Sequence, residues 1–251
     1  MSFLFTVSPD FTPDHLSGWY MFNTWLQRQT GDDIHLEIYN DFQSQRGAIQ
    51  DDKVDLIYAN PFDAAMLVRE KNFMPLVKAS NQSDEAMIAV NADSPVESVE
   101  QLKAGTKVAY TEDPGVQLMG MMMLEPAELY ADNITSVLSD SYVLVAKQLM
   151  KNQADVGIFL AEAYDDLSSI VKKQMKVLVR SQISVIHHSL MAGPKLQHKV
   201  TDLQNILTTM EHDEKGSGIL EVMKLPGWET VENEEMEFMI DLMDTLDFTD
   251  M

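Results

Sequence analysis

Polar side chains follow a short apolar run within residues 54–65, which read VDLIYANPFDAA. The apolar part is too short for a helix and is bounded by turn residues, so it predicts a strand buried on both faces of a parallel sheet. Asn60 and Pro61 then end the strand, because proline cannot continue a central strand but suits the first turn of a helix. Ligands of open α/β sheets bind at such turns, where the helix N-terminus offers unpaired N–H groups.

Asn60 and Asp63 give this turn an amide and a carboxylate. If Asp63 points toward a ligand, it favours one with a hydrogen-bond donor or a positive group. If Asp63 instead caps its own helix, it carries no information about a ligand. An ordinary strand-to-helix connection without any ligand is the plainer interpretation of this stretch.

Three further groups of side chains could take part in chemistry. Glu112 and Asp113 are adjacent carboxylates, Glu162 opens an acidic segment, and His187 precedes a second histidine. Acid–base catalysis needs a matched partner across the substrate, and nothing in the sequence identifies one. Acidic residues also suit a helix start, and adjacent residues of a strand point to opposite faces, so neighbouring histidines rarely hold one metal ion. We therefore expect no catalytic residue, no metal site and no cofactor.

Composition argues against several classes of partner. The 251 residues, of which 45% are hydrophobic, suffice for one large domain or two small ones. The 40 acidic and 18 basic residues give a formal net charge of −22. This charge disfavours binding to nucleic acid and to anionic membranes. The chain has no cysteine, which excludes disulfides, thiolate metal sites and a cysteine nucleophile.

The N-terminal residues predict a strand. No stretch of the chain approaches the ~18 apolar residues of a membrane span, so we expect no direct membrane insertion. Met1 leads almost at once into the apolar segment FLFTV at 3–7, which reads as the first strand of the fold. We therefore expect either a cytoplasmic protein or an exported one whose leader was replaced by a methionine.

Predicted strands and helices alternate in two series, separated by polar segments. Strands of the first series are predicted at 3–7, 34–38, 54–59 and 74–79, with helices between them. A strand is predicted at 86–90, between two polar segments. Strands of the second series are predicted at 107–110, 134–138, 156–159 and 177–179, with helices near 116–124, 142–151 and 161–172. An extended segment at 182–191 then leads to one long helix at 194–207, a short helix at 216–225, a turn at 226–228 and a last helix at 232–246. Such alternation is typical of an α/β fold with mainly parallel sheets.

Two α/β lobes follow from these series. The C-terminal helices are too few to form a third domain, so we expect them to return to the first lobe. Lobe I would then comprise residues 1–82 and 186–251, and lobe II residues 83–185. The chain would cross between the lobes twice, near 79–86 and 180–187. Two lobes joined in this way form a ligand cleft that can hinge.

Six segments, in order along the chain, resemble the phosphate, phosphite and phosphonate substrate-binding proteins of bacterial ABC transporters. The most specific is KVDLIYANPF at 53–62, which is similar to the family's KVDIAYLGPF. The others lie at 5–9, 40–42, 92–103, 152–157 and 218–228. The resemblance implies the type II periplasmic binding fold. It also implies a binder and not an enzyme: a monomeric periplasmic protein that grips a small molecule between its lobes and passes it to an ABC permease.

The resemblance also implies site residues. Phe42 falls where the family has a ligand-contacting tyrosine, Tyr142 where many members have a histidine, and His187 near a family aspartate. Glu162 matches a glutamate that faces the amine of aminophosphonates. Residues 113–117 fall where a Ser-Thr-Ser loop at a helix start grips an oxyanion. The complete set of candidate ligand-binding residues is Asp10, Phe11, Phe42, Asn60, Phe62, Asp63, Glu112, Gly115, Val116, Gln117, Tyr142, Glu162 and His187.

The differences from the family at these positions indicate which kind of ligand the chain binds. The anion-gripping hydroxyls of the loop are absent here, and Glu112 and Asp113 stand nearby, while an amine-facing carboxylate persists at Glu162. Because like charges repel, a zwitterionic, cationic or neutral ligand is favoured over a simple phosphonate. Two alternatives to a transporter component stay open: a ligand-sensing domain with a signalling partner, and a cytoplasmic enzyme on the same scaffold.

Overall fold

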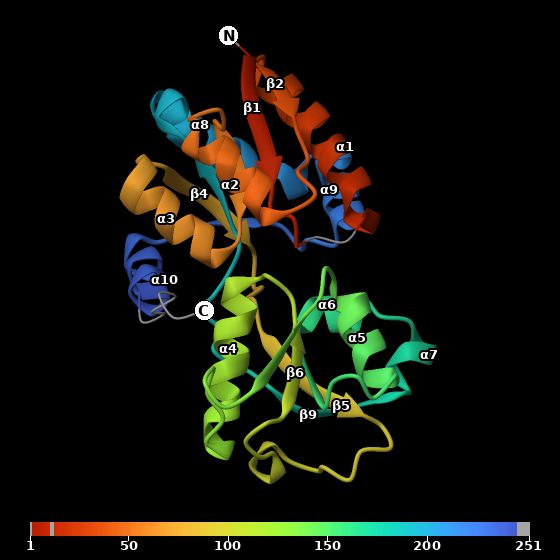
Figure 1. The fold of residues 1–251 in the computed structure, drawn as a ribbon. Helices are drawn as coiled ribbons and strands as arrows, with labels where there is room; N and C mark the ends of the chain where they lie inside the picture. The colour runs from red at the N-terminus through yellow and green to blue at the C-terminus, as the bar shows by residue number, and fades with distance from the viewer. Residues whose placement is uncertain (1, 11–12, 245–251) are drawn as a thin grey trace. The chain divides into compact units, whose positions relative to one another are not determined.

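The computed structural model describes residues 2–10 and 13–244. These residues form two compact units: lobe I, residues 2–83 and 185–244, and lobe II, residues 84–184. Each lobe holds one mixed β-sheet with helices packed on it (Figure 1). The alternation of strands and helices that predicted an α/β fold is thus confirmed, although each sheet contains antiparallel strands.

The sheet of lobe I has six strands in the order β11-β4-β10-β3-β1-β2. Strand β1 pairs in parallel with β2 and β3, whereas β10 is antiparallel to β3 and β4, and β11 is antiparallel to β4. The bounds are β1 Ser2–Val7, β2 Asp33–Leu36, β3 Leu56–Ala59, β4 Met74–Ala79, β10 Ser189–Ala192 and β11 Trp228–Thr230.

Both faces of this sheet are covered, as a fully apolar β3 predicts. Leu56 and Tyr58 belong to the core beneath one set of helices, and Ile57 and Ala59 to the core beneath the other. Successive strand residues point to opposite faces, so β3 contributes to both cores. The first set is α1 Pro13–Thr30, α8 Val200–Thr208 and α9 Glu214–Met223, and the second is α2 Phe42–Gln50, α3 Pro61–Lys71 and α10 Asn233–Asp244.

The sheet of lobe II has five strands in the order β7-β6-β8-β5-β9. Strand β6 is parallel to β7 and β8, and β5 is antiparallel to β8 and β9. The strands are β5 Ala86–Asn91, β6 Lys107–Tyr110, β7 Thr135–Leu138, β8 Val156–Leu160 and β9 Met175–Arg180. The helices are α4 Pro114–Leu124, α5 Tyr142–Met150, α6 Ala161–Asp165 and α7 Ser169–Lys172.

Two predicted elements of lobe I differ in the structure. The single long helix predicted at 194–207 is a 3₁₀ segment, Pro194–Lys199, followed by α8. Lys199 at the junction has φ −110° and ψ 0°, and its amine pairs with Asp32 at 2.5 Å, so the chain turns there instead of continuing one helix. The predicted turn at 226–228 contains the start of strand β11, because Trp228 pairs with Ala79 at the edge of the sheet.

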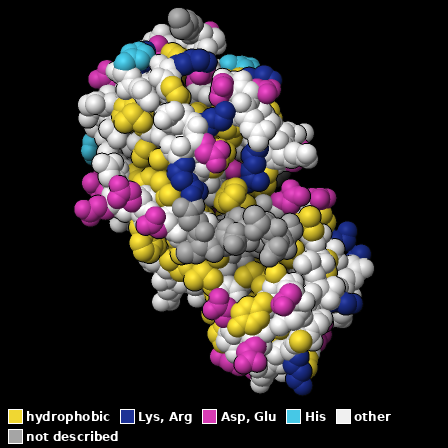
Figure 2. Space-filling view, turned by 60° about the vertical axis from the view of Figure 1, so that its left-hand side comes forward, with side chains coloured by type: hydrophobic (Ala, Val, Ile, Leu, Met, Phe, Trp, Pro, Cys, Tyr) yellow, Lys and Arg dark blue, Asp and Glu magenta, His cyan; other side chains and the backbone are white. Residues whose placement is uncertain are grey.

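The chain carries a formal net charge of −22. Figure 2 shows acidic side chains on the visible face, with lysines and arginines among them. None of the helices in the described part of the chain is both long and apolar enough to cross a membrane.

Candidate ligand-binding site

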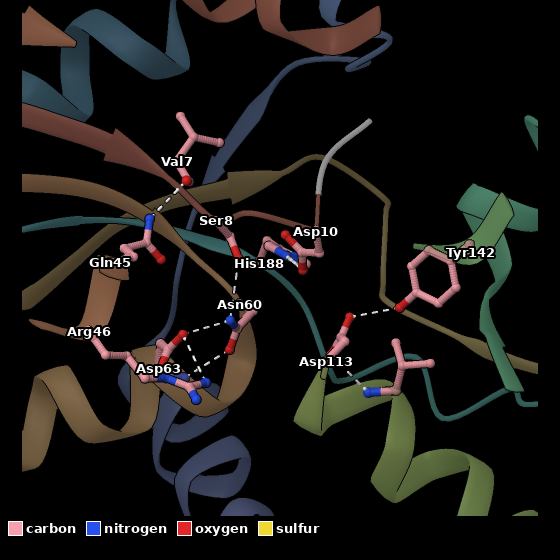
Figure 3. Close-up of polar contacts among 11 residues, drawn as sticks. Val7, Ser8, Asp10, Gln45, Arg46, Asn60, Asp63, Asp113, Tyr142 and His188 are labelled. Carbon is pink, nitrogen blue, oxygen red and sulfur yellow. Dashed lines mark hydrogen bonds and ion pairs between the residues drawn. The ribbon is translucent and has the colours of Figure 1, made fainter. Parts of the chain in front are cut away.

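Asn60 organises the polar network at the carboxyl ends of β1 and β3 in lobe I (Figure 3). Its side-chain oxygen accepts a hydrogen bond from the Asp63 N–H at 2.9 Å and so caps helix α3. Its amide nitrogen donates to Asp63 Oδ2 at 2.8 Å and to Ser8 Oγ at 3.3 Å. One alternative from the sequence was that Asp63 caps α3. In the structure, Asn60 is the capping residue. Asp63 itself is 1% exposed and faces the protein interior.

The buried Asp63 carboxylate holds Arg46, a residue of α2 that the sequence analysis missed. Arg46 Nε donates to Asp63 Oδ1 at 2.7 Å, and Nη2 donates to Oδ2 at 3.3 Å. The guanidinium also lies over two aromatic rings, 5.2 Å from the centroid of Phe42 and 5.1 Å from that of Phe62. The spacing of Phe42 and Arg46 was a usable signal, because residues four apart share one face of a helix.

Asp10 forms a second buried pair in lobe I, with His188. The distance from His188 Nε2 to Asp10 Oδ2 is 2.8 Å, and the imidazole stacks on the Tyr58 ring with centroids 5.4 Å apart. Burial raises the pKa of the Asp10 carboxyl, but His188 and a hydrogen bond from Ser8 outweigh it and hold the pKa below its ordinary value. Phe11, the next candidate residue, lies outside the described residues.

His187 points away from this pair, as adjacency on an extended segment predicts. Its Nδ1 lies 3.1 Å from Ser189 Oγ, and its Nε2 lies 3.4 Å from Glu235 Oε1. Glu235 also pairs with Lys78. Of the two neighbouring histidines, the structure therefore brings His188 to Asp10 and places His187 against helix α10.

In lobe II, Asp113 occupies the N-terminus of α4. Its Oδ1 accepts the N–H of Val116 at 3.1 Å, and its Oδ2 accepts the hydroxyl proton of Tyr142 at 3.0 Å. Asp113 is 2% exposed, and Tyr142 is also buried. Gly115 and Val116 are buried in the first turn of α4, and Gln117 is half-buried. The Asp113 carboxylate thus links the predicted loop at 113–117 to the predicted site residue Tyr142. From the sequence, Asp113 was considered only as a charge near that loop.

Two hydroxyls beside this cap were not among the predicted residues. Thr111 and Ser139 directly follow the parallel neighbours β6 and β7. Thr111 Oγ1 and Ser139 Oγ are buried and have no hydrogen-bond partner among the described residues. A polar residue directly after a buried strand was the available signal for Thr111.

Two acidic candidates, Glu112 and Glu162, remain in lobe II. Glu112 is exposed on the loop before α4, and Glu162 is half-buried at the second position of the short helix α6. Within residues 2–10 and 13–244, no group of three His, Asp or Glu side chains could hold a metal ion.

The sequence matches the family of ABC transporter, phosphonate, periplasmic substrate-binding proteins over residues 5–236. The chain belongs to this family. It is therefore the substrate-binding component of an ABC transport system, as the resemblance of its six segments predicted. No curated protein sequence gives a significant match.

Solved structures show the same fold at low sequence identity. PhnD1 from Prochlorococcus marinus, in complex with methylphosphonate, has a TM-score of 0.85 with 12% identity over 98% of both chains. A binding protein component of an ABC phosphonate transporter from Pseudomonas aeruginosa has a TM-score of 0.79 with 16% identity, over 97% of this chain and 87% of its own. The periplasmic aliphatic sulphonate binding protein SsuA from Escherichia coli has a TM-score of 0.66 with 13% identity, over 97% and 86%. The chain thus has the type II periplasmic binding fold.

Proposed function

We propose that this substrate-binding protein captures a small polar solute with a positive or hydrogen-bond-donating group. It works in the periplasm as a monomer, performs no catalysis and delivers its solute to an ABC permease. Membership of the phosphonate-binding family supports the transport role. The chemistry of lobe II supports the choice of solute.

The single observation behind this choice is the Asp113 carboxylate at the N-terminus of α4. A helix N-terminus attracts oxyanions through its unpaired N–H groups and its dipole. Here a carboxylate of the protein already accepts the Val116 N–H and the Tyr142 hydroxyl. A second anion at this position would lie against a buried negative charge and would be repelled. A cation or a donor group would be attracted to the same carboxylate.

The test compares solutes that differ by one group. Binding of methylphosphonate, 2-aminoethylphosphonate and ethanolamine is measured by isothermal titration calorimetry and by thermal shift. We expect at least tenfold tighter binding of an amine-bearing solute than of methylphosphonate, because only the amine can pair with Asp113. Tight binding of methylphosphonate or of inorganic phosphate, with no gain from an amine, would contradict the proposed solute.

The substitution Asp113→Asn tests whether the charge of Asp113 causes the preference for an amine. Asp155→Asn is its matched control. Asp113→Asn keeps a cap oxygen but removes the charge, so we expect the preference for an amine to fall at least tenfold. Asp155 is also in lobe II and accepts the Lys107 N–H at 2.8 Å, but it lies at the start of β8, away from the Asp113 cap. Its substitution should leave the preference unchanged.

A further inference from the structure

Arg46 presents an unused edge of its guanidinium. Its Nε and Nη2 donate to Asp63, whereas Nη1 makes no hydrogen bond to any of the residues described in the structure. The Arg46 side chain is 30% exposed, while the Asp63 side chain is 1% exposed. One edge of the guanidinium is therefore held from within the protein, and the edge formed by Nη1 and the second proton of Nη2 is available for another acceptor.

The guanidinium is also restrained on its faces. Phe42 and Phe62 place their rings 5.2 and 5.1 Å from the guanidinium carbon, and cation–π attraction stabilises this arrangement. Asp63 is itself fixed by Asn60, which donates to its Oδ2 at 2.8 Å. A cation whose orientation is set before a ligand arrives loses little conformational freedom on binding.

A second ion pair to a buried carboxylate in lobe I has different surroundings. Lys195 pairs with the buried Asp55 at 2.8 Å, yet the Lys195 side chain is 59% exposed. Asp55 also accepts a hydrogen bond from the N–H of Leu4, so its carboxylate holds the backbone at that residue. Arg46, by contrast, is gripped by a carboxylate and two rings at the carboxyl end of β3, where ligands of α/β sheets bind.

We propose that Arg46 determines specificity by binding an oxyanion of the solute through Nη1 and Nη2. Asp63, Phe42 and Phe62 act as positioning residues that hold the guanidinium. This inference rests on the proposed function and extends it: the solute carries an anionic group, which Arg46 binds, in addition to its donor or cationic group, and is therefore a zwitterion. Arginine suits this task because its planar fork matches the two oxygens of a carboxylate, sulfonate or phosphonate.

The experiment uses four probes that share an aminoethyl group. 2-Aminoethylphosphonate, taurine and β-alanine carry a phosphonate, a sulfonate and a carboxylate, and ethanolamine carries no oxyanion. Calorimetric affinities are measured for the wild type, Arg46→Met and Arg180→Met. Arg180 pairs with Asp165 on the exposed surface of lobe II, so Arg180→Met removes one positive charge without touching lobe I.

We expect at least one zwitterion to bind tenfold or more tightly than ethanolamine, and Arg46→Met to abolish that difference. Ethanolamine binding should change less than threefold in Arg46→Met, and Arg180→Met should behave as the wild type. The zwitterion with the highest affinity identifies the oxyanion. Arg46→Lys keeps a charge beside Asp63 but lacks the fork, so a tenfold loss of zwitterion binding is expected from it even if Arg46→Met does not fold.

Three results would overturn the proposal. If the Arg46 variants bind the preferred zwitterion within threefold of the wild type, Arg46 has no role in recognition, and the proposed function stands. If ethanolamine binds as tightly as the zwitterions, there is no oxyanion subsite, and the proposed function again stands. If none of the four probes binds at 10 mM, both proposals fail.

Discussion

At the scale of single residues, Asp63 shows how a buried carboxylate can hold a neighbouring cation. It does not cap α3, and its side chain is buried. Asn60 caps the helix, and the Asp63 carboxylate accepts hydrogen bonds from Arg46 and Asn60. An uncompensated buried carboxylate is costly, whereas one with these donors is stable and orients the cation that it contacts.

Asp63→Ala should therefore lower both stability and zwitterion affinity. The substitution removes the partner of Arg46 and one acceptor of the Asn60 amide, so the free energy of unfolding should fall by about 1–3 kcal/mol. Urea denaturation monitored by tryptophan fluorescence measures this change. Asp51→Ala is the control, because Asp51 and Lys53 form an exposed pair, and its loss should change stability little. A wild-type unfolding curve for Asp63→Ala would show that the pair with Arg46 contributes nothing.

At the scale of elements, the two lobes repeat one local design with opposite electrostatics. Helices α3 and α4 both follow a strand, begin with proline at the first turn and use the preceding Asx residue as a cap. The cap of α3 is the neutral amide of Asn60, with Arg46 nearby, and the cap of α4 is the carboxylate of Asp113. The same backbone arrangement thus lies at the proposed anion site in lobe I and at the proposed cation site in lobe II.

The position of α4 depends on a glycine. A Cβ atom added to Gly120 would lie 2.4 Å from Cγ2 of the fully buried Ile158 on β8, so Gly120→Ala should displace the helix and destabilise the protein by about 1–3 kcal/mol. Chemical denaturation measures the loss. Gly218→Ala in α9 is the matched control, because nothing lies within 4 Å of its Cβ and alanine favours a helix. Equal stability of the two variants would show that α4 is not held by this contact.

At the scale of the whole molecule, net charge opposes folding. A charge of −22 on 251 residues produces self-repulsion that salt screens. We therefore expect the melting temperature to rise between 20 and 500 mM NaCl, by about 2–4 °C for each kcal/mol of repulsion relieved. Differential scanning calorimetry measures the shift. Sucrose at matched osmolality is the control, because it does not screen charge, and a melting temperature that falls with salt would contradict this account.

Much of the fold was predictable because its signals are local. The apolar run before Asn60 and Pro61 predicted β3 and the start of α3, and both are present. The antiparallel pairing of β10 and β11 was not predictable, because the direction of pairing depends on where the returning chain meets the sheet. Strand β11 was missed altogether, since three residues are too few to show an alternating pattern, and Trp228 is recognisable as a strand residue only beside Ala79.

The sequence by itself determined the α/β class, the family and the helix start at Pro61, since each depends on residues close together in the chain. Only the tertiary structure decided which side chains meet. Arg46 and Asp63 are 17 residues apart, Asp113 and Tyr142 are 29 apart, and Asp10 and His188 are 178 apart. Spacing along the chain cannot specify such contacts, because they form only where the ends of separate strands come together in the folded sheet.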